Sequence, residues 1–509
     1  MNSYLLYPQQ NLSSEKAYPS FADIEKDLNL TIIRRTMARD DPYMMEQIRS
    51  VMMVPVCDPA VIMYRCDIIR NFYTQESLVN EMYELGRQGA VLSSRYREEC
   101  EQNRHKSTSK TGFILSTLSF MEKSISLLRR LADLLTDQKE QLHADGLLRL
   151  RERLSGYPLE EFDEFHKQIL FYTTGGEGVF SIRMSGGLKL EQSRLLHCQQ
   201  NKEQNGKLTS NKLFRLYVKA VKKDTVLIED EMLDRELRQF VELHMEQLMK
   251  FYEPLIAGIQ AFWREFGREI SFYKGVHTLQ TRMDEFKLPF CYGECSDDGQ
   301  KQIDELYELS LALYVQKKPV PNSFHDKQTT LTIITGANQG GKSTFLRSLG
   351  IAQVMMQCGM PIPASKFKTR LYERIHTHFT RKEDAMLSRG RLEEELKRMS
   401  GIVSQLVSNS LLLLNESFAS TTEKEGSMIA YGIIMPLYEK KIEVMMVTHL
   451  HEFASSMYEK NLTGTQFLVA ERTKNGDRTF RMLPGKPHYS SYGTDLFQAM
   501  IEGEQTLTD

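Results

Sequence analysis

A glycine-rich stretch in the C-terminal half of the chain combines the residue types that bind phosphate groups. Residues 336–343 read GANQGGKS, which satisfies the pattern G-x-x-x-x-G-K-[ST]. In such a loop, glycines let backbone N–H groups close around phosphates, the lysine bridges the β- and γ-phosphates, and the serine hydroxyl binds Mg²⁺. Ser343 is therefore a predicted ligand of both nucleotide and metal. The residues predicted to bind ATP here are Gly336, Asn338, Gly340, Gly341, Lys342, Ser343 and Thr344.

The neighbouring residues supply the strand, loop and helix that this pattern requires. LTIIT at 331–335 is an apolar run typical of a buried strand, and FLRSLGIAQVMMQ at 345–357 has the composition of a helix. The N-terminus of that helix adds a partial positive charge where phosphates bind. The alternative interpretation, a glycine turn with an incidental lysine, does not account for this order of elements.

A second apolar run ends in residues suited to metal binding and hydrolysis. SLLLLNES at 410–417 reads as a strand that ends at Asn415 and Glu416. Phosphate-loop enzymes usually have an aspartate at the first of these positions. Because asparagine brings no charge, we expect Asn415 to bind Mg²⁺ more weakly and hydrolysis to be slow. Glu416 is the residue predicted to polarise the attacking water.

A third apolar run, VMMVTH at 444–449, ends in His449. A histidine at this place could sense the γ-phosphate, and we predict a catalytic role for it beside Glu416. The alternative is a structural histidine, which is commoner at a strand end. The functional interpretation depends on His449 following the other two strands.

These motifs together resemble one family, the MutS proteins of DNA mismatch repair, whose ATPase belongs to the ABC group of P-loop enzymes. The resemblance is collinear over most of residues 315–500. It implies a DNA-dependent ATPase that uses ATP and Mg²⁺. The segments that carry it are Pro321-Asn322, GANQGGKST, GMPIPA (359–364), SRGRLEEEL (388–396), LLLLNESFASTTEKEG (411–426), THLHEF (448–453) and SSYG (490–493).

The resemblance also implies a homodimer in which one subunit completes the nucleotide site of the other. Ser388 and Arg391 would then bind nucleotide across the interface, and Arg389 or Arg391 would stabilise charge on the γ-phosphate. The alternative for these arginines is surface charge at the start of a helix. The family's glycine-rich stretch after the acidic pair is replaced here by residues 418–423, which changes the expected dimer contacts.

The parts of the chain that precede this site differ in their predicted secondary structure. Residues 21–164 have helix composition, and residues 119–138 and 232–266 read as helices, the latter long enough for an extended arm. Between these helices, glycine pairs and short β-prone runs at 171–190 and 212–230 indicate a small inserted strand-rich module.

This arrangement resembles the core, lever and clamp of MutS proteins. The predicted fold class is multidomain α and α/β: a helical core and lever domain with an inserted small β clamp, followed by an ABC-type P-loop ATPase domain. The predicted segments are 1–55 for the first part of the helical core, 56–310 for the core and lever with a clamp at about 172–230, and 311–509 for the ATPase domain.

The predicted clamp is basic although the whole chain is almost neutral. The chain carries a formal net charge of −2, whereas ten Lys and Arg face three acidic residues between positions 183 and 227. Such an excess attracts a phosphate backbone, although a solvated loop would also use lysines. We predict DNA as the partner, as a mismatched, branched or distorted duplex. The alternative function is a low-turnover, ATP-gated scaffold or clamp on branched DNA or structured RNA.

Composition excludes some classes of protein. No apolar run approaches the roughly 20 residues that span a bilayer, and the first residues, MNSYLLYPQQ, do not read as a signal peptide. The seven cysteines are scattered, and Cys291 with Cys295 has no second pair to complete a zinc site. We predict a cytoplasmic protein without membrane contact.

The mismatch-reading domain of the family, with its Phe-x-Glu wedge, should precede the helical core. The core-like helices begin within the first few tens of residues, so we expect a short form without that domain. Phe251-Tyr252-Glu253 matches the wedge in spelling, but it lies in the long helix beyond the predicted clamp, where packing is the simpler interpretation.

Overall fold

The structure is a computed structural model that describes residues 3–8, 17–105, 110–156, 177–184, 190–199, 231–380, 388–473 and 477–487. Its internal contacts divide the chain into two units, Met1–Tyr4 with Ser77–Ile270 and Leu5–Glu76 with Ser271–Asp509. The segment boundaries predicted at 55 and 310 stay a prediction. Within the described ranges, no helix is long and apolar enough to cross a membrane.

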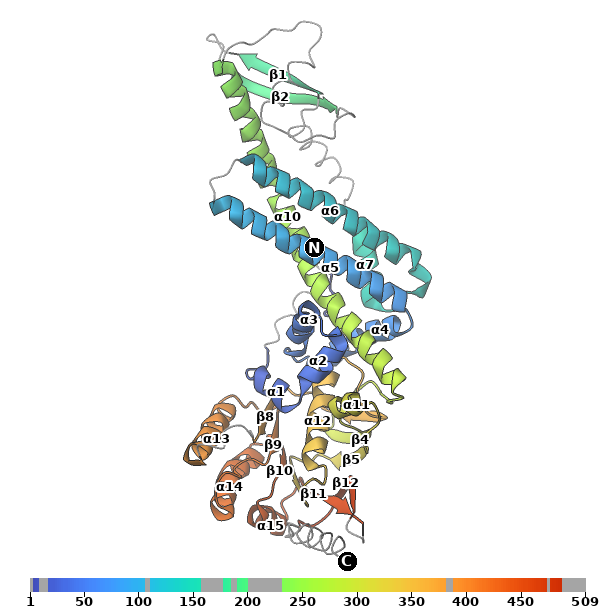
Figure 1. The fold of residues 1–509 in the computed structure, drawn as a ribbon, viewed down its shortest axis with the longest axis vertical. Coiled ribbons are helices and arrows are strands. Elements are labelled where there is room, and N and C mark those ends of the chain that lie inside the picture. The colour runs from blue at the N-terminus through green and yellow to red at the C-terminus, as the bar shows by residue number, and fades with distance from the viewer. Residues whose placement is uncertain are drawn as a thin grey trace, which may run out of the picture. The chain divides into compact units, whose positions relative to one another are not determined.

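The first unit is built mainly from long helices (Figure 1). The helix predicted at 119–138 lies inside α6, and α10 begins near the predicted residue but continues to Glu285. The elements are α5 (Glu76–His105), α6 (Lys110–Asp137), a short 3-10 turn (Lys139–Gln141), α7 (Asp145–Ser155) and the first part of α10 (Glu231–Glu285).

Two glycines let α5 and α10 approach each other closely. A Cβ atom placed on Gly89 would lie 2.2 Å from the ring of Trp263, and one on Gly86 would lie 2.7 Å from Ile270. Trp263 is fully buried beside Phe262 and Phe266. Because any larger residue would push the helices apart, these positions set the packing distance.

Part of the predicted clamp is described as strands β1 (Glu177–Met184) and β2 (Leu190–Gln199). They pair antiparallel, with Glu177 opposite Gln199. The second predicted β-prone run, at 212–230, and most of the basic residues counted above lie outside the described residues. The clamp and lever arrangement therefore stays a proposal.

The second unit contains the glycine-rich loop and two mixed sheets. Its helices are α1 (Phe21–Asp27), α2 (Leu30–Ala38), α3 (Pro42–Met52), α4 (Pro59–Tyr73), the end of α10, α11 (Leu309–Val315), α12 (Lys342–Gln357), α13 (Ser388–Val403), α14 (Glu423–Glu439) and α15 (His451–Glu459). Its strands are β3 (Glu294–Cys295), β4 (Gln300–Leu306), β5 (Asn322–Lys327), β6 (Leu331–Thr335), β7 (Lys366–Thr369), β8 (Arg374–Phe379), β9 (Ser410–Asn415), β10 (Glu443–Val447), β11 (Thr465–Arg472) and β12 (Arg478–Pro484).

The larger sheet has the order β12-β11-β6-β10-β9-β8. Neighbouring strands from β11 to β8 run parallel, and β12 pairs antiparallel with β11. The loops after β6, β9 and β10 consequently leave the sheet at one edge, where ligands of α/β proteins usually bind. The smaller sheet has the order β3-β7-β4-β5. The strand predicted at 331–335 is confirmed, the strand predicted to end at Asn415 and Glu416 ends at Asn415, and β10 ends two residues before His449.

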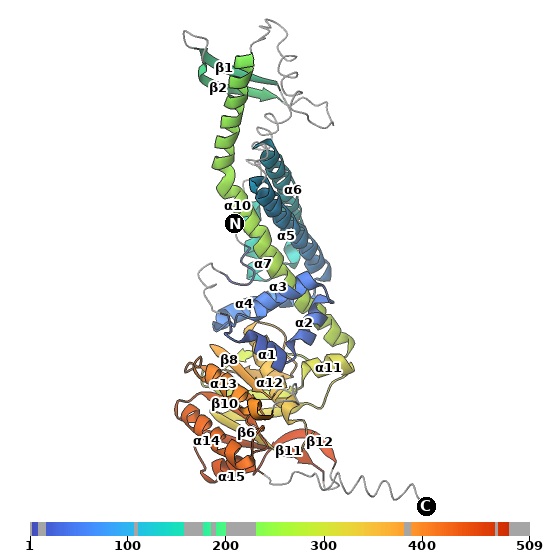
Figure 2. The same cartoon turned by 60° about the vertical axis from the view of Figure 1, so that its left-hand side comes forward.

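Helices cover both faces of the larger sheet (Figure 2). On one face, α13, α14 and α15 pack in an apolar cluster with alternate strand residues such as Leu412, Leu414, Val444 and Met446. On the other face, α12 is buried almost all round, and its Phe345 ring meets Phe324 of β5 in the smaller sheet at 6.3 Å. Burial on both faces explains why these strands read as continuous apolar runs.

Candidate functional site

The glycine-rich loop joins β6 to α12 in a conformation that excludes side chains. Gly336 and Gly341 have φ angles of +115° and +90°, in the left-handed region that glycine tolerates. A Cβ atom on Gly336 would lie 2.9 Å from the backbone nitrogen of Ala470, and one on Gly340 would lie 2.9 Å from the Cβ of that residue. The neighbouring strand β11 thus packs closely on the loop, and glycine is required for this packing as well as for the predicted approach of phosphates.

Lys342 is the first residue of α12 and is only 4% exposed. Its Nζ donates hydrogen bonds to the carbonyl oxygens of Gly336 at 2.8 Å and Ala337 at 2.9 Å. Burial lowers the pKa of Lys342 to about 8, while the nearby Glu416 carboxylate opposes that shift. The ammonium is therefore held inside the loop by partners that phosphate oxygens can replace.

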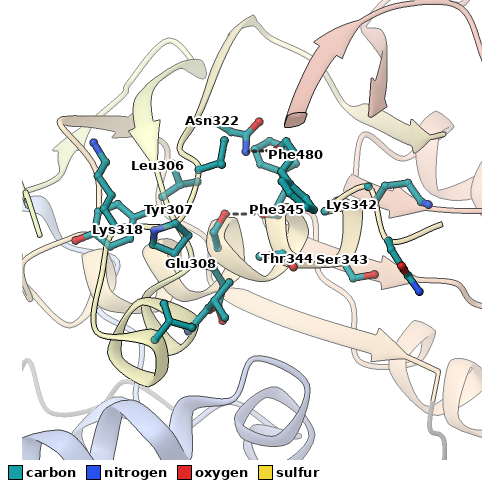
Figure 3. A pocket seen from close by; sticks show the side chains of 18 of the residues that line it. Leu306, Tyr307, Glu308, Lys318, Asn322, Lys342, Ser343, Thr344, Phe345 and Phe480 are labelled. Atoms are coloured by element: carbon teal, nitrogen blue, oxygen red, sulfur yellow. Dashed lines mark hydrogen bonds between the residues drawn. The ribbon is translucent and has the colours of Figure 1, made fainter. Parts of the chain in front are cut away.

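A cavity of 680 Å³ opens beside this loop (Figure 3). Its volume is in the range of sites for small molecules and cofactors. The loop and the start of α12 form one wall, to which Glu416 also belongs. The opposite wall comes from the segment between β4 and β5, including Leu306, Tyr307, Glu308, Leu311, Val315, Lys317, Lys318, Pro319, Val320 and Asn322.

Phe480 of β12 also lines the cavity, although no sequence motif indicates a role for it. Asn322 holds it in place, because its Nδ2 donates to the Phe480 carbonyl at 3.2 Å and its Oδ1 accepts from the Met482 N–H at 2.7 Å. Phe480 has a φ of +61°, a strained conformation for a non-glycine residue. Pro321-Asn322 is one of the segments that carry the family resemblance. The sequence indicates the importance of Asn322 only in this way and does not show what Asn322 does.

Glu416 and His449 meet at the edge of the sheet. They follow the adjacent parallel strands β9 and β10, in which Asn415 lies opposite Val447. His449 Nε2 lies 3.1 Å from Glu416 Oε1, and both side chains are about one third exposed, at 32% and 37%. The two predicted catalytic residues are thus a hydrogen-bonded pair, one member of which faces the cavity.

The loop that carries His449 is anchored to the segment after Glu416. The first two backbone N–H groups of α15, those of His451 and Glu452, donate to Glu423 Oε1 at 3.0 and 3.3 Å. Glu423 is the first residue of α14, so its carboxylate caps a neighbouring helix. The segment 418–423, in which this chain departs from the expected family pattern, therefore connects the loops of both predicted catalytic residues.

Asn415 is the last residue of β9. Its Oδ1 atom is buried, and the described part of the chain provides no hydrogen-bond partner for it. Mg²⁺ prefers oxygen ligands and usually keeps several waters. The Ser343 hydroxyl lies in the cavity wall, and Asn415 immediately precedes Glu416 of that wall without lining the cavity itself; both side chains carry an oxygen of the kind that Mg²⁺ prefers.

The remaining predicted residues are placed as follows. Asn338 lies exposed at the tip of the loop, and its neighbour Gln339 accepts a hydrogen bond from Arg478 of β12 at 2.6 Å. Ser343 and Thr344 are half-buried in the cavity wall. Ser388 is the first residue of α13, so the segment that begins at Ser388 does start a helix. The action of Ser388 and Arg391 across a dimer interface stays a prediction.

Two family models match the chain. The one described as MutS2 N-terminal domain matches residues 57–286, and the one described as MutS domain V matches residues 332–504. The chain is similar to "DNA mismatch repair protein MutS" of Thermotoga maritima, with 31% identity over 34% of this chain and 22% of that protein. The protein of the same name from Thermosipho melanesiensis is 25% identical over 50% of this chain and 32% of its own length.

The chain is also similar to a mismatch-repair protein of a eukaryote. "Probable DNA mismatch repair protein Msh6" of Drosophila melanogaster is 30% identical over 38% of this chain and 17% of that protein. The chain thus spans less than a third of the length of these relatives.

Proposed function

Because the chain belongs to the MutS family, we propose that it is an ATP-dependent DNA-binding protein of the mismatch-repair type. It binds DNA through a clamp and changes state when it binds and hydrolyses ATP. The observation that carries this proposal is that Lys342 of the phosphate loop and Glu416, paired with His449, face one cavity. A binding loop and a catalytic carboxylate in one cavity are what ATP hydrolysis requires.

Phosphate binding begins at the loop. Residues 340–343 line the cavity at the start of α12, where the helix dipole adds positive potential. Lys342 Nζ exchanges the carbonyls of Gly336 and Ala337 for oxygens of the β- and γ-phosphates. The exchange favours the charged ammonium, which burial alone disfavours.

The base and ribose occupy the opposite wall. The apolar side chains of Leu311, Val315 and Val320 line the cavity on that side, whereas Phe480 lies against the glycine-rich loop, 3.5 Å from where a Cβ atom on Gly341 would be. An aromatic ring and aliphatic side chains suit the faces of a purine. We infer that the phosphates of ATP lie at Lys342 and that its base lies between this wall and Phe480.

Hydrolysis uses the Glu416 and His449 pair. The Glu416 carboxylate accepts a proton from water that attacks the γ-phosphate, and His449 holds the carboxylate by its hydrogen bond. Ser343 and Asn415 would hold Mg²⁺, which would supply positive charge against the phosphates. With a neutral amide at Asn415 in place of a carboxylate, hydrolysis is slow.

The remaining parts of the proposal concern DNA and assembly. Residues 56–310 form the core and lever, the basic stretch within 172–230 grips the DNA backbone, and residues 311–509 form the ATPase domain. The protein acts as a cytoplasmic homodimer in which Ser388 and Arg391 reach the nucleotide of the partner. Phosphate contacts make binding depend on the shape of a mismatched, branched or distorted duplex.

A second function is favoured by Asn415. A low-turnover, ATP-gated clamp on branched DNA or structured RNA needs nucleotide binding but little hydrolysis, and an uncharged residue at this position fits that behaviour. Lys342 and the loop serve both functions equally.

ATP turnover by the purified chain separates them. It is measured alone and with homoduplex, mismatched and branched DNA and structured RNA, beside Glu416→Gln and Lys342→Met. Turnover that DNA stimulates and Glu416→Gln abolishes supports the ATPase. Tight ATP binding without turnover on any nucleic acid supports the gated clamp, and ATP binding unaffected by Lys342→Met contradicts both.

A further inference from the structure

The turn that carries Glu416 is held by a side chain from a neighbouring strand. Thr380 directly follows β8, which lies beside β9 with Phe379 opposite Asn415. Thr380 Oγ1 donates to the carbonyl oxygen of Glu416 at 2.7 Å and also lies 3.1 Å from that of Asn415. The Thr380 N–H donates to the Asn415 carbonyl at 3.1 Å. One residue thus binds the backbone of both members of the predicted acidic pair.

This contact matters because the backbone of Glu416 is strained. Glu416 has a φ of +55°, in the left-handed region that non-glycine residues avoid. Such a conformation persists only where surrounding contacts hold it, and it is commonest at functional sites. The Glu416 N–H donates to the Val447 carbonyl of β10 at 2.9 Å. The peptide group before Glu416 is therefore bound by both Val447 and Thr380, and the carbonyl of the peptide group after it is bound by the Thr380 hydroxyl.

The direction of the Glu416 side chain follows from this backbone conformation. With φ at +55°, Glu416 reaches both the cavity and His449, as the 3.1 Å contact shows. If the Glu416 carbonyl lost its hydroxyl partner, the turn could relax toward ordinary backbone angles and carry the carboxylate away from His449. Thr380 is half-buried, and the cavity lining among the described residues includes Glu416 but not Thr380.

We propose that Thr380 is a positioning residue for ATP hydrolysis, whose hydroxyl holds the Glu416 carbonyl so that the carboxylate points into the cavity and toward His449. This inference rests on the proposed ATPase function and assigns a second residue to it. Thr380 acts through Glu416 and leaves nucleotide binding to the glycine-rich loop. The hydroxyl is the essential group, since a side chain of the same shape without it cannot bind the carbonyl.

The test removes the hydroxyl and keeps the shape. Thr380→Val should lower kcat about 10- to 100-fold, because a small misplacement of a catalytic group has such an effect, and should leave the affinity for ATP within about twofold. Thr380→Ser keeps the hydroxyl and should restore most of the rate. Thr465→Val is the matched control, because its hydroxyl also donates to a backbone carbonyl, that of Leu462 at 2.7 Å, but at the start of β11. Its kcat should equal that of the unmodified chain.

A double-mutant cycle distinguishes positioning from general stability. In a Glu416→Gln background, Thr380→Val should cause no further loss of rate in single-turnover measurements, since the group that it positions is already disabled. Thr380→Ala replaces Thr380→Val in the same cycle if the valine variant does not fold.

Two results overturn the inference while the ATPase function stands: unchanged kcat in Thr380→Val, or a loss of kcat and ATP affinity together that Thr380→Ser does not restore. A further independent loss in the Glu416→Gln background also overturns it. Absence of turnover by the unmodified chain under every condition would instead contradict the ATPase function, and the inference with it.

Discussion

The imidazole of His449 and the carboxylate of Glu416 form a hydrogen bond of 3.1 Å across two adjacent parallel strands. The residues are 33 positions apart in the sequence. They meet because β9 and β10 are in register and end at the same edge of the sheet. Glu416 also lines the cavity beside Lys342, so the pair connects the sheet edge to the glycine-rich loop.

Replacing Glu416 by glutamine should uncouple ATP binding from hydrolysis. Glutamine keeps the size and a hydrogen bond to His449 but cannot accept a proton, so kcat should fall about 100- to 10,000-fold with ATP affinity retained. Stopped-flow nucleotide binding and single-turnover hydrolysis measure the two quantities. Glu439→Gln, an exposed acid at the end of α14, is the control and should behave like the unmodified chain. Retained turnover in Glu416→Gln would mean that another group activates water.

Replacing Lys342 by methionine should remove nucleotide binding without unfolding the protein. The aliphatic stem stays in the buried position, but the charge that binds phosphate is lost, so affinity should fall about 100-fold or more. Titration of a fluorescent ATP analogue measures this loss. The thermal midpoint without nucleotide serves as the control for folding. Unchanged affinity would contradict the assignment of the phosphate site.

ATP affinity should fall as the pH rises through about 8. Burial lowers the pKa of Lys342 to about 8 in the free protein, and phosphates bind the protonated form. Protonation is nearly complete at pH 7 and lost above pH 8, so affinity should be about tenfold lower at pH 9 than at pH 7. Calorimetry in buffers of different ionisation enthalpy should show proton uptake on binding near pH 8.

The same pKa shift predicts a change in stability. The unfolded chain binds more protons than the folded one between pH 8 and the ordinary lysine value, so Lys342 should add stability as pH rises through this window. A rise in pH should therefore weaken ATP binding while it increases the stability of the folded chain. In Lys342→Arg the charge persists throughout, and the pH dependence of binding should vanish. A pH dependence that persists in this variant would come from another group.

Changing Asn415 to aspartate should tighten Mg²⁺ binding. The amide oxygen is buried without a partner among the described residues, and a carboxylate there gains charge toward the cation. Without Mg²⁺ the same buried charge should lower the thermal midpoint, since a buried carboxylate needs a partner. We expect the Mg²⁺ concentration at half-maximal ATP binding to fall several-fold. An unchanged Mg²⁺ dependence would exclude Asn415 as a metal ligand.

Removing the Asn322 side chain should weaken ATP binding through Phe480. Asn322→Ala loses both hydrogen bonds to β12 and frees Phe480 from its strained conformation. The KM for ATP should rise about three- to tenfold at constant kcat, because the loss concerns binding alone. Phe480→Ala should raise the KM similarly, and the double variant should show no further rise. Additive rises in KM would mean that Asn322 and Phe480 act independently on ATP binding.

Local sequence predicted the elements whose cause is local. Apolar runs with strand length gave β6 and β9, and the glycine spacing identified the loop between β6 and Lys342. The predicted end of the third strand at His449 was two residues late, because Thr448 and His449 continue the β-prone pattern while the strand pairing stops at Val447. The helix predicted to end at residue 266 continues as α10 to Glu285, because helical periodicity does not mark where packing stops a helix.

Residue types and their spacing alone predict the phosphate loop, the residues at the ends of the following strands, and the family. These depend on residue type and spacing over a few positions, which the chain carries wherever it folds. Only the tertiary structure decided that Thr380 binds the Glu416 carbonyl, that Asn322 fixes Phe480, and that both walls enclose one cavity. Backbone carbonyls look alike at every position of a sequence, so a side chain that binds one from another strand leaves no pattern in the residues themselves.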